Sequence, residues 1–206
     1  MLKALGYGFI ILAAMACPPA AVAGAQIYEP LAASVRAGLQ ASIADAPAPH
    51  HAFSNSMDAV NWLTEMAQRL EKRVPHLRTR LDLLRTVHYE AARAGLDPQL
   101  VLAVVHVESN FRKFAVSSAG ARGYMQVMPF WVGLIGRKGD DLFTLRTNLR
   151  YGCVILRHYL DVERGDLFRA LGRYNGSLGR PEYPNMVLRA MRARWKYSAA
   201  PGSGRS

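Results

Sequence analysis

The sequence has few cysteines, few acidic residues and none of the short motifs that mark common cofactor sites. Its 206 residues include 2 cysteines, so at most one intramolecular disulfide can form. It contains no His-Glu-x-x-His, no cysteine pair at zinc spacing, no phosphate-cradling glycine motif and no calcium-loop signature. His50-His51 lie in a proline-rich stretch, where solvated side chains are a better interpretation than metal ligands. We therefore expect neither a metal nor another cofactor.

Acidic residues are outnumbered, with 15 Asp and Glu against 26 Lys and Arg, which gives a formal net charge of +11. Such a charge favours polyanionic partners, namely nucleic acid, an anionic membrane or an acidic cell-wall polymer. The basic run Arg189 to Lys196 either forms a solvated helix face with Trp195 buried, which we favour, or touches an anionic membrane or wall. Membrane contact is expected to be peripheral at most.

The first residues have the pattern of an export signal. Lys3 supplies the positive start, residues 6–16 an apolar stretch, and Ala21-Val22-Ala23 a cleavage site of small residues. The apolar stretch is shorter than the roughly 20 residues that span a bilayer. We expect residues 1–23 to be a signal peptide and the mature protein to be secreted across the inner membrane into the periplasm, which makes nucleic acid an unlikely partner.

Two alternatives to cleavage are a retained membrane anchor and lipidation of Cys17. The sequence before Cys17 lacks the usual Leu, and two prolines follow it. Cleavage would remove Cys17 and leave Cys153 in an apolar helical stretch, where a buried thiol is expected.

Hydrophobic periodicity predicts an all-α fold in which irregular loops connect the helices. Residues 24–55 are expected to form a short weak helix and an Ala/Pro-rich linker, residues 56–197 a single helical domain and residues 198–206 a flexible tail. No alternating strand pattern is evident. The expected helices of the domain cover Ser56 to near Pro75, Leu77–Ala94, a segment starting at Asp97-Pro98, and segments around Tyr124–Ile135, Leu149–Val162, Leu167–Tyr174 and Pro184–Tyr197.

Glu108 is anomalous because it ends the most hydrophobic of these helices. Apolar surroundings disfavour a charged carboxylate, so we expect Glu108 to exchange a proton near the working pH. Periodicity alone leaves the alternative that Glu108 simply reaches solvent at the helix end. His106 points to the other side of the helix and is expected to be a satisfied core histidine. The face of the helix that carries Glu108 is otherwise formed by Val101, Val104 and Val105.

Three blocks of sequence resemble, in order, the soluble lytic transglycosylase domain family. They are Val107–Phe111, Ala115–Pro129 and Tyr174-Asn175, and the resemblance runs from about Ala92 to Trp195. In that family the Glu of the first block is the catalytic acid/base, which implies the same role for Glu108. The resemblance implies that residues 56–197 form a lytic transglycosylase catalytic domain, a lysozyme-like helical domain with irregular active-site loops. It further implies that the substrate is contacted by Ser109, Met125, Gln126, Tyr174 and Asn175.

The chain departs from the family pattern at two positions. Tyr124 stands where Leu is usual, which implies a changed sugar subsite, and Arg173 stands where Ala is common, which adds positive charge beside the groove. Considered without the family, the Tyr174 hydroxyl can hydrogen-bond the Glu108 carboxyl or a substrate oxygen, and the amides of Gln126 and Asn175 suit sugar hydroxyls and acetamido groups.

The resemblance implies cleavage of peptidoglycan strands at the MurNAc-GlcNAc bond, with 1,6-anhydro-MurNAc ends. Ordinary glycosidases need a second carboxylate, and none is evident here. In the family the C6 hydroxyl of the substrate attacks its own anomeric carbon, so Glu108 alone serves as acid and then as base. The alternatives are a hydrolytic muramidase of the goose-lysozyme type and a non-catalytic wall-binding module. Partners beyond the glycan strands could include cell-envelope or secretion machinery.

Overall fold

The structure is a computed structural model that describes residues 26–44 and 56–198. The predicted signal peptide, most of the predicted linker and all but one residue of the predicted tail lie outside this part of the chain. The described residues form eight α-helices and one π-helical segment, η1. Their bounds are α1 Ala33–Ile43, α2 Ser56–Leu70, α3 Leu77–Arg93, α4 Pro98–Ser109, α5 Phe130–Ile135, α6 Leu145–Val162, α7 Leu167–Asn175, α8 Glu182–Ala190 and η1 Met191–Trp195.

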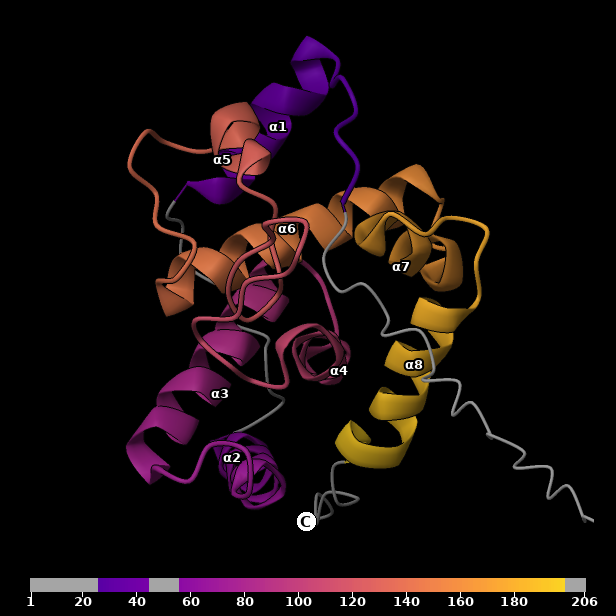
Figure 1. Ribbon diagram of the computed structural model, residues 1–206. Coiled ribbons are helices and arrows are strands. Elements are labelled where there is room, and N and C mark those ends of the chain that lie inside the picture. The colour runs from indigo at the N-terminus through magenta and orange to yellow at the C-terminus, as the bar shows by residue number, and fades with distance from the viewer. Residues whose placement is uncertain (1–25, 45–55, 199–206) are drawn as a thin grey trace, which may run out of the picture.

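The predicted all-α class is confirmed, since the described residues contain no β-strand, only two isolated bridges. Helix α4 lies at the centre and is seen nearly along its axis in Figure 1. It packs against α3, α8 and η1, while α6 packs against α3 and α7. None of the described helices is long and apolar enough to cross a membrane.

The central position of α4 follows from its sequence. The Asp97 side chain caps the helix by accepting a hydrogen bond from the Gln99 amide at 2.8 Å, and Pro98 occupies the first helical position. Residues 100–105 are all buried, so this helix is apolar on every side. The prediction of a buried central helix is confirmed.

The prediction of a helix around Tyr124–Ile135 is wrong for the first half of this segment, because α5 begins only at Phe130. Gly123 and Gln126 have φ angles of 76° and 49°, and this left-handed conformation interrupts a right-handed helix. The chain instead closes a tight turn in which Arg122 and Val127 exchange two backbone hydrogen bonds, both 3.0 Å long. Hence the middle block of the resemblance lies mainly on a loop.

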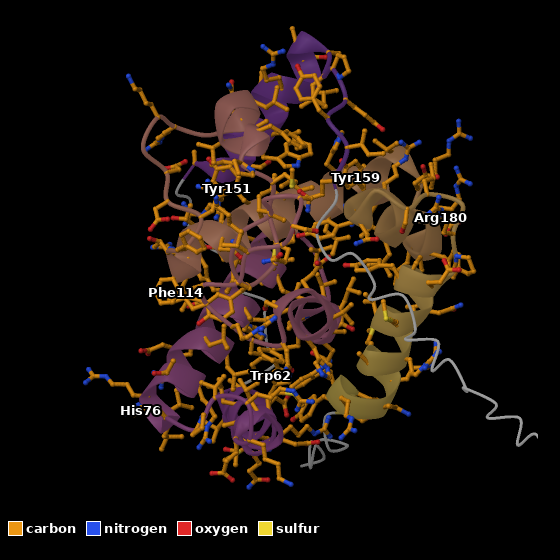
Figure 2. All side chains as sticks on the ribbon, in the orientation of Figure 1. Trp62, His76, Phe114, Tyr151, Tyr159 and Arg180 are labelled. Carbon is orange, nitrogen blue, oxygen red and sulfur yellow. The ribbon has the colours of Figure 1, made fainter. Side chains whose placement is uncertain are left out.

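The N-terminal segment packs onto the rest of the described chain. Its helix α1 contacts α5 and α6, and Leu39 and Ile43 belong to the same hydrophobic core as the central helix. Tyr151 and Tyr159 lie on α6, on the side of the molecule that carries α1 and α5 (Figure 2).

Two further predictions concern single side chains. Cys153 is a buried free thiol whose pKa burial raises well above the ordinary value, so the prediction of a buried thiol is confirmed. Trp195 is also buried, as expected for the helix face that carries the basic run.

Candidate active site

Glu108 lies in the last turn of α4 and is 4% exposed, so the helix carries its carboxyl group into the interior. The structure thereby excludes the alternative in which Glu108 simply reaches solvent. Asn110 ends the helix in a left-handed conformation with a φ angle of 48°, and Phe111 follows at 63°. The chain therefore turns sharply after the Glu-Ser pair and enters the loop that carries the middle block.

Tyr183 donates a hydrogen bond to Glu108, and its hydroxyl lies 2.6 Å from the Oε1 atom of Glu108. Tyr183 is buried near the start of α8. Burial and, next in size, the charge of Glu108 raise the pKa of Tyr183 well above its ordinary value. The hydroxyl therefore keeps its proton and remains a donor toward Glu108 at any working pH.

Sequence reasoning missed Tyr183. The available signal was its spacing of four residues from the buried Val187, which indicates a shared helix face but not a partner for Glu108.

The other residues predicted at the site lie on three elements that hydrogen bonds tie together. The Ser109 hydroxyl lies 2.8 Å from the carbonyl oxygen of Tyr124 and 3.1 Å from that of Val105. The Tyr174 hydroxyl donates to the carbonyl oxygen of Met125 at 2.8 Å. These bonds connect the end of α4 and the end of α7 to the loop between them, so the structure brings the three sequence blocks together.

The polar groups of this region face inward. Ser109, Met125, Gln126, Tyr174 and Asn175 are all buried. The Gln126 side-chain amide donates to the carbonyl oxygens of Gly123 at 2.9 Å and Ala115 at 3.1 Å. The hydrogen bonds of Ser109, Gln126 and Tyr174 therefore hold the loop in shape.

A buried asparagine on α6 organises the same loop. The Asn148 Oδ1 atom accepts a hydrogen bond from the Met125 amide at 2.8 Å, and its Nδ2 atom donates to the carbonyl oxygens of Arg122 and Leu142, each at 2.8 Å. A Cβ atom on Gly123 would approach Asn148 Nδ2 to 2.4 Å. Asn148 and Gly123 thus fix the turn by close packing, which the sequence pattern did not reveal.

Residues near the N-terminal end of the described chain also reach this region. The Gln26 Oε1 atom accepts a hydrogen bond from the Met128 amide at 3.1 Å, and its Nε2 atom donates to the carbonyl oxygen of Gln126 at 3.4 Å. Gln26 also contacts the Tyr174 hydroxyl, and Glu29 pairs with Arg173 at 3.3 Å. The N-terminal segment therefore braces the loop and α7.

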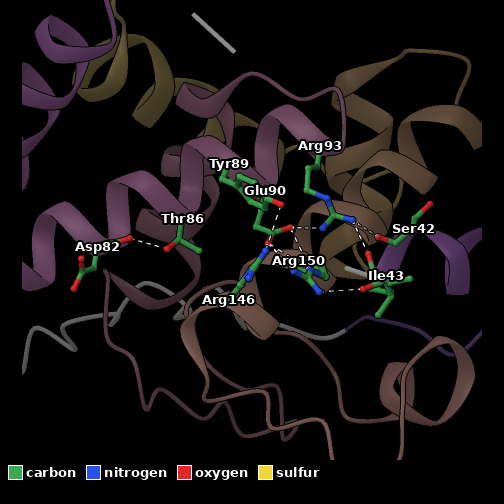
Figure 3. Close-up of polar contacts among 10 residues, drawn as sticks. Ser42, Ile43, Asp82, Thr86, Tyr89, Glu90, Arg93, Arg146 and Arg150 are labelled. Atoms are coloured by element: carbon green, nitrogen blue, oxygen red, sulfur yellow. Dashed lines mark hydrogen bonds and ion pairs between the residues drawn. The ribbon is translucent and has the colours of Figure 1, made fainter. Parts of the chain in front are cut away.

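A second buried carboxylate, Glu90 of α3, has different surroundings. It pairs with Arg93 at 2.9 Å, Arg150 at 3.2 Å and Arg146 at 3.4 Å (Figure 3). The same arginines bind the end of α1, since Arg93 donates to the carbonyl oxygen of Ala44 and Arg150 to that of Ile43. This cluster ties α1, α3 and α6 together, so we interpret Glu90 as a structural carboxylate.

Metal ligands do not gather in the described part of the chain, where no group of three or more His, Cys, Asp or Glu side chains is placed to hold a metal ion. His106 does not contribute a ligand either, because its two ring nitrogens face Arg73 and Trp195. The expectation that it is a satisfied core histidine needs refinement, since the ring is half-buried and both of these neighbours are donors.

Comparison with known proteins identifies the domain. Residues 85–184 match the family described as the transglycosylase SLT domain. This range includes Glu108, the loop, Tyr174-Asn175 and Tyr183. Residues 85–184, just under half of the chain, therefore resemble the transglycosylase SLT domain, and the all-α architecture agrees with a lysozyme-like domain of this kind.

Several curated proteins are similar over part of the chain. Membrane-bound lytic murein transglycosylase C of Actinobacillus pleuropneumoniae serotype 5b (strain L20) is 47% identical over 53 residues, which are 25% of this chain and 14% of that protein. The transglycosylase of Enterobacteria phage PRD1 is 32% identical over 111 residues, 50% of this chain and 41% of that protein. Membrane-bound lytic murein transglycosylase C of Yersinia pestis (strain Pestoides F) is 32% identical over 109 residues, 45% of this chain and 30% of that protein. The chain thus spans less than half the length of these relatives.

Proposed function

We propose that this protein is a peptidoglycan lytic transglycosylase that cleaves the MurNAc-GlcNAc bond and leaves 1,6-anhydro-MurNAc ends. The observation that carries the proposal is the buried Glu108 carboxyl, held 2.6 Å from the Tyr183 hydroxyl within the transglycosylase SLT domain. The names of the similar proteins, lytic murein transglycosylases, support the same reaction.

In the proposed reaction Glu108 is the sole general acid/base. Its protonated carboxyl gives a proton to the glycosidic oxygen of the leaving GlcNAc, and the bond from that oxygen to C1 of MurNAc breaks. The carboxylate then takes the proton of the MurNAc C6 hydroxyl, whose oxygen bonds to C1 and closes the 1,6-anhydro ring. Each cycle returns the proton to Glu108, so no water is consumed and no second carboxylate is needed.

Tyr183 fits this mechanism as a positioning residue. Its hydroxyl donates to the carboxylate that forms after the first proton transfer, and a hydrogen bond to a charged acceptor stabilises that charge. The fixed donor also holds the carboxyl group in one orientation for both proton transfers.

A single-carboxylate mechanism is supported by the surroundings of the other buried acid. Among the described residues Glu90 and Glu108 are buried acidic residues, and the Glu163 side chain, 7% exposed, pairs with Arg169 and Arg173. Arg93, Arg146 and Arg150 surround the Glu90 carboxylate and tie α3 to α6, which suits a structural anchor better than a proton donor.

We also propose that five buried residues shape the wall of the sugar-binding groove from behind, namely Ser109, Met125, Gln126, Tyr174 and Asn175. The hydrogen bonds of Ser109, Gln126 and Tyr174 to loop carbonyl groups support a role in shaping that wall. Replacement of any of the five is expected to raise KM more than it lowers kcat. Wild-type kinetics for all five variants would remove them from the site.

Mass spectrometry of sacculus digests tests the reaction itself. We expect products that end in 1,6-anhydro-MurNAc, whereas reducing ends would identify a hydrolytic muramidase of the goose-lysozyme type. Release of no product by the folded protein would favour a non-catalytic peptidoglycan-binding module.

Export to the periplasm after removal of residues 1–23 agrees with this substrate, because peptidoglycan lies outside the inner membrane. The proposal expects the extracytoplasmic protein to begin near Gly24. An intact Met1, or lipid on Cys17, would contradict it.

A further inference from the structure

A strongly basic pocket lies apart from Glu108, between the C-terminal end of α2 and segment η1. Its cavity has a volume of ≈ 470 Å³ and is lined by Arg69, Arg73 and residues 192–196. Five of these side chains are cationic, and none of the described residues that line the pocket carries a carboxylate. We call this cavity the basic pocket.

The basic pocket is built by specific contacts. Arg69 pairs with Glu65 and donates to the carbonyl oxygens of Lys196 at 2.7 Å and Arg194 at 3.1 Å, which holds the η1 segment against α2. Segment η1 is a π-helix, a rare conformation that is frequent at functional sites. The other four cations, Arg73, Arg192, Arg194 and Lys196, make no ion pair with any carboxylate in residues 26–44 and 56–198.

One wall of the basic pocket has more hydrogen-bond donors than acceptors. The Arg73 Nη2 atom lies 3.0 Å from Nε2 of His106, and the Trp195 Nε1 atom lies 3.3 Å from Nδ1 of the same ring. Burial, followed by the charges of Arg73 and Arg194, lowers the pKa of His106 to about 4, so its ring is neutral at neutral pH. A neutral imidazole has a single acceptor nitrogen. One of the two donors therefore lacks an acceptor on this ring, and a bound anion would supply one.

We propose that the basic pocket binds a carboxylate of the peptides that peptidoglycan strands carry. This identification of the anion rests on the proposed function. Guanidinium groups recognise carboxylates through paired N–H donors, and Arg73, Arg192 and Arg194 supply three such groups around one cavity.

The surface around the pocket favours a peptide over a lipid bilayer. Protein segments that lie on a membrane present large apolar side chains next to their basic ones. None of the exposed large apolar residues of the described chain lines the basic pocket, and its one aromatic residue, Trp195, is 1% exposed. A concave cavity with five cationic side chains and no carboxylate among the described residues that line it fits a discrete anionic group.

The pocket is attached to the helix that carries the catalytic acid. The Arg73 Nε atom donates to Oδ1 of Asn110 at 2.8 Å, and Asn110 caps α4 directly after Glu108-Ser109. His106 and Asn110 share the face of α4 opposite to Glu108. Arg73 and Asn110 thus connect the basic pocket to the same end of α4 that carries Glu108.

Binding of a soluble wall tetrapeptide tests the proposal directly. The pocket variant is Arg192→Gln/Arg194→Gln, and the matched control is Arg36→Gln/Arg164→Gln, which removes the same charge from exposed positions on α1 and after α6. The titration follows the indole N–H resonance of Trp195 by NMR. We expect the pocket variant to bind the tetrapeptide about fivefold more weakly than the wild type and the control. The same peptide with amidated carboxylates should bind no better to the wild type than to the pocket variant.

Two results would overturn the proposal. The first is equal tetrapeptide affinity in the pocket variant and the wild type. The second is loss, in the pocket variant, of binding to phosphatidylglycerol vesicles while the wild type shows no affinity for the tetrapeptide, because the anion would then be a lipid phosphate.

Turnover on sacculi separates this proposal from the proposed function. The pocket variant should show a KM raised about fivefold with kcat unchanged. If the wild type released no anhydro products, the proposed function would fail, whereas the peptide titration would still decide whether the pocket binds carboxylates.

Discussion

Replacement of Tyr183 by Phe removes one hydroxyl and leaves the buried ring in place. The hydroxyl donates to the Glu108 carboxyl over 2.6 Å. Hydrogen bonds to charged groups contribute about 1.5–3 kcal/mol. If this energy is realised when the carboxylate forms, the loss corresponds to a fall in kcat of about 10- to 150-fold, at 1.4 kcal/mol for each factor of ten.

The assay is the initial rate of anhydro-muropeptide release from sacculi, with thermal unfolding measured on the same preparation. Tyr151→Phe is the matched control, because the Tyr151 hydroxyl donates to the Asp140 carboxylate at 2.5 Å, away from Glu108. The control should lose stability but keep its kcat. A folded Tyr183→Phe enzyme with wild-type kcat would refute the positioning role, and an equal fall in the control would show that the loss is not specific to Glu108.

Three further perturbations have defined outcomes. Glu108→Gln keeps the size of the side chain but cannot exchange a proton, so glycan release should fall by at least about 10²-fold with the fold retained; near-normal release would end the single-acid mechanism. Glu90→Gln leaves buried arginines without their counter-charge and should lower the free energy of unfolding by about 3 kcal/mol in urea titrations, and an unchanged midpoint would contradict this. The folded protein has a His106 pKa of about 4, so between pH 6.5 and 4 the unfolded chain binds a proton at His106 that the folded protein does not. The free energy of unfolding should therefore decrease as the pH is lowered through this window. His106→Phe should show a smaller fall, and an identical pH dependence would exclude this cause.

The sequence predicted the helices well wherever their start and burial depend only on neighbouring residues. Asp97-Pro98 is a complete start signal, and the apolar run that follows allows only a buried element. The segment 124–129 failed because its conformation depends on distant groups. Asn148 of α6 binds its backbone, and no helix propensity reports that contact.

The residues of the candidate site could be predicted where a local sequence pattern or a family block marks them. Glu108 was identifiable as an acid on an apolar helix and by its place in the first block. Tyr183 was not, because its role depends on how α8 packs on α4, 75 residues along the chain. Gln26 was missed for the same reason, since a glutamine in an irregular segment carries no periodic signal.

The bonds of Gln26 have a consequence for the order of folding. Its partner Gln126 is 100 residues away, so this contact closes one of the longest chain loops described here. Closing a long loop costs conformational entropy before the contact returns any energy, and contacts of high sequence separation form late. During synthesis, which proceeds from the N-terminus onward, Gln26 emerges well before the loop that it braces. The loop of the candidate site should therefore be among the last parts of the protein to assemble, after the helices around α4 have packed.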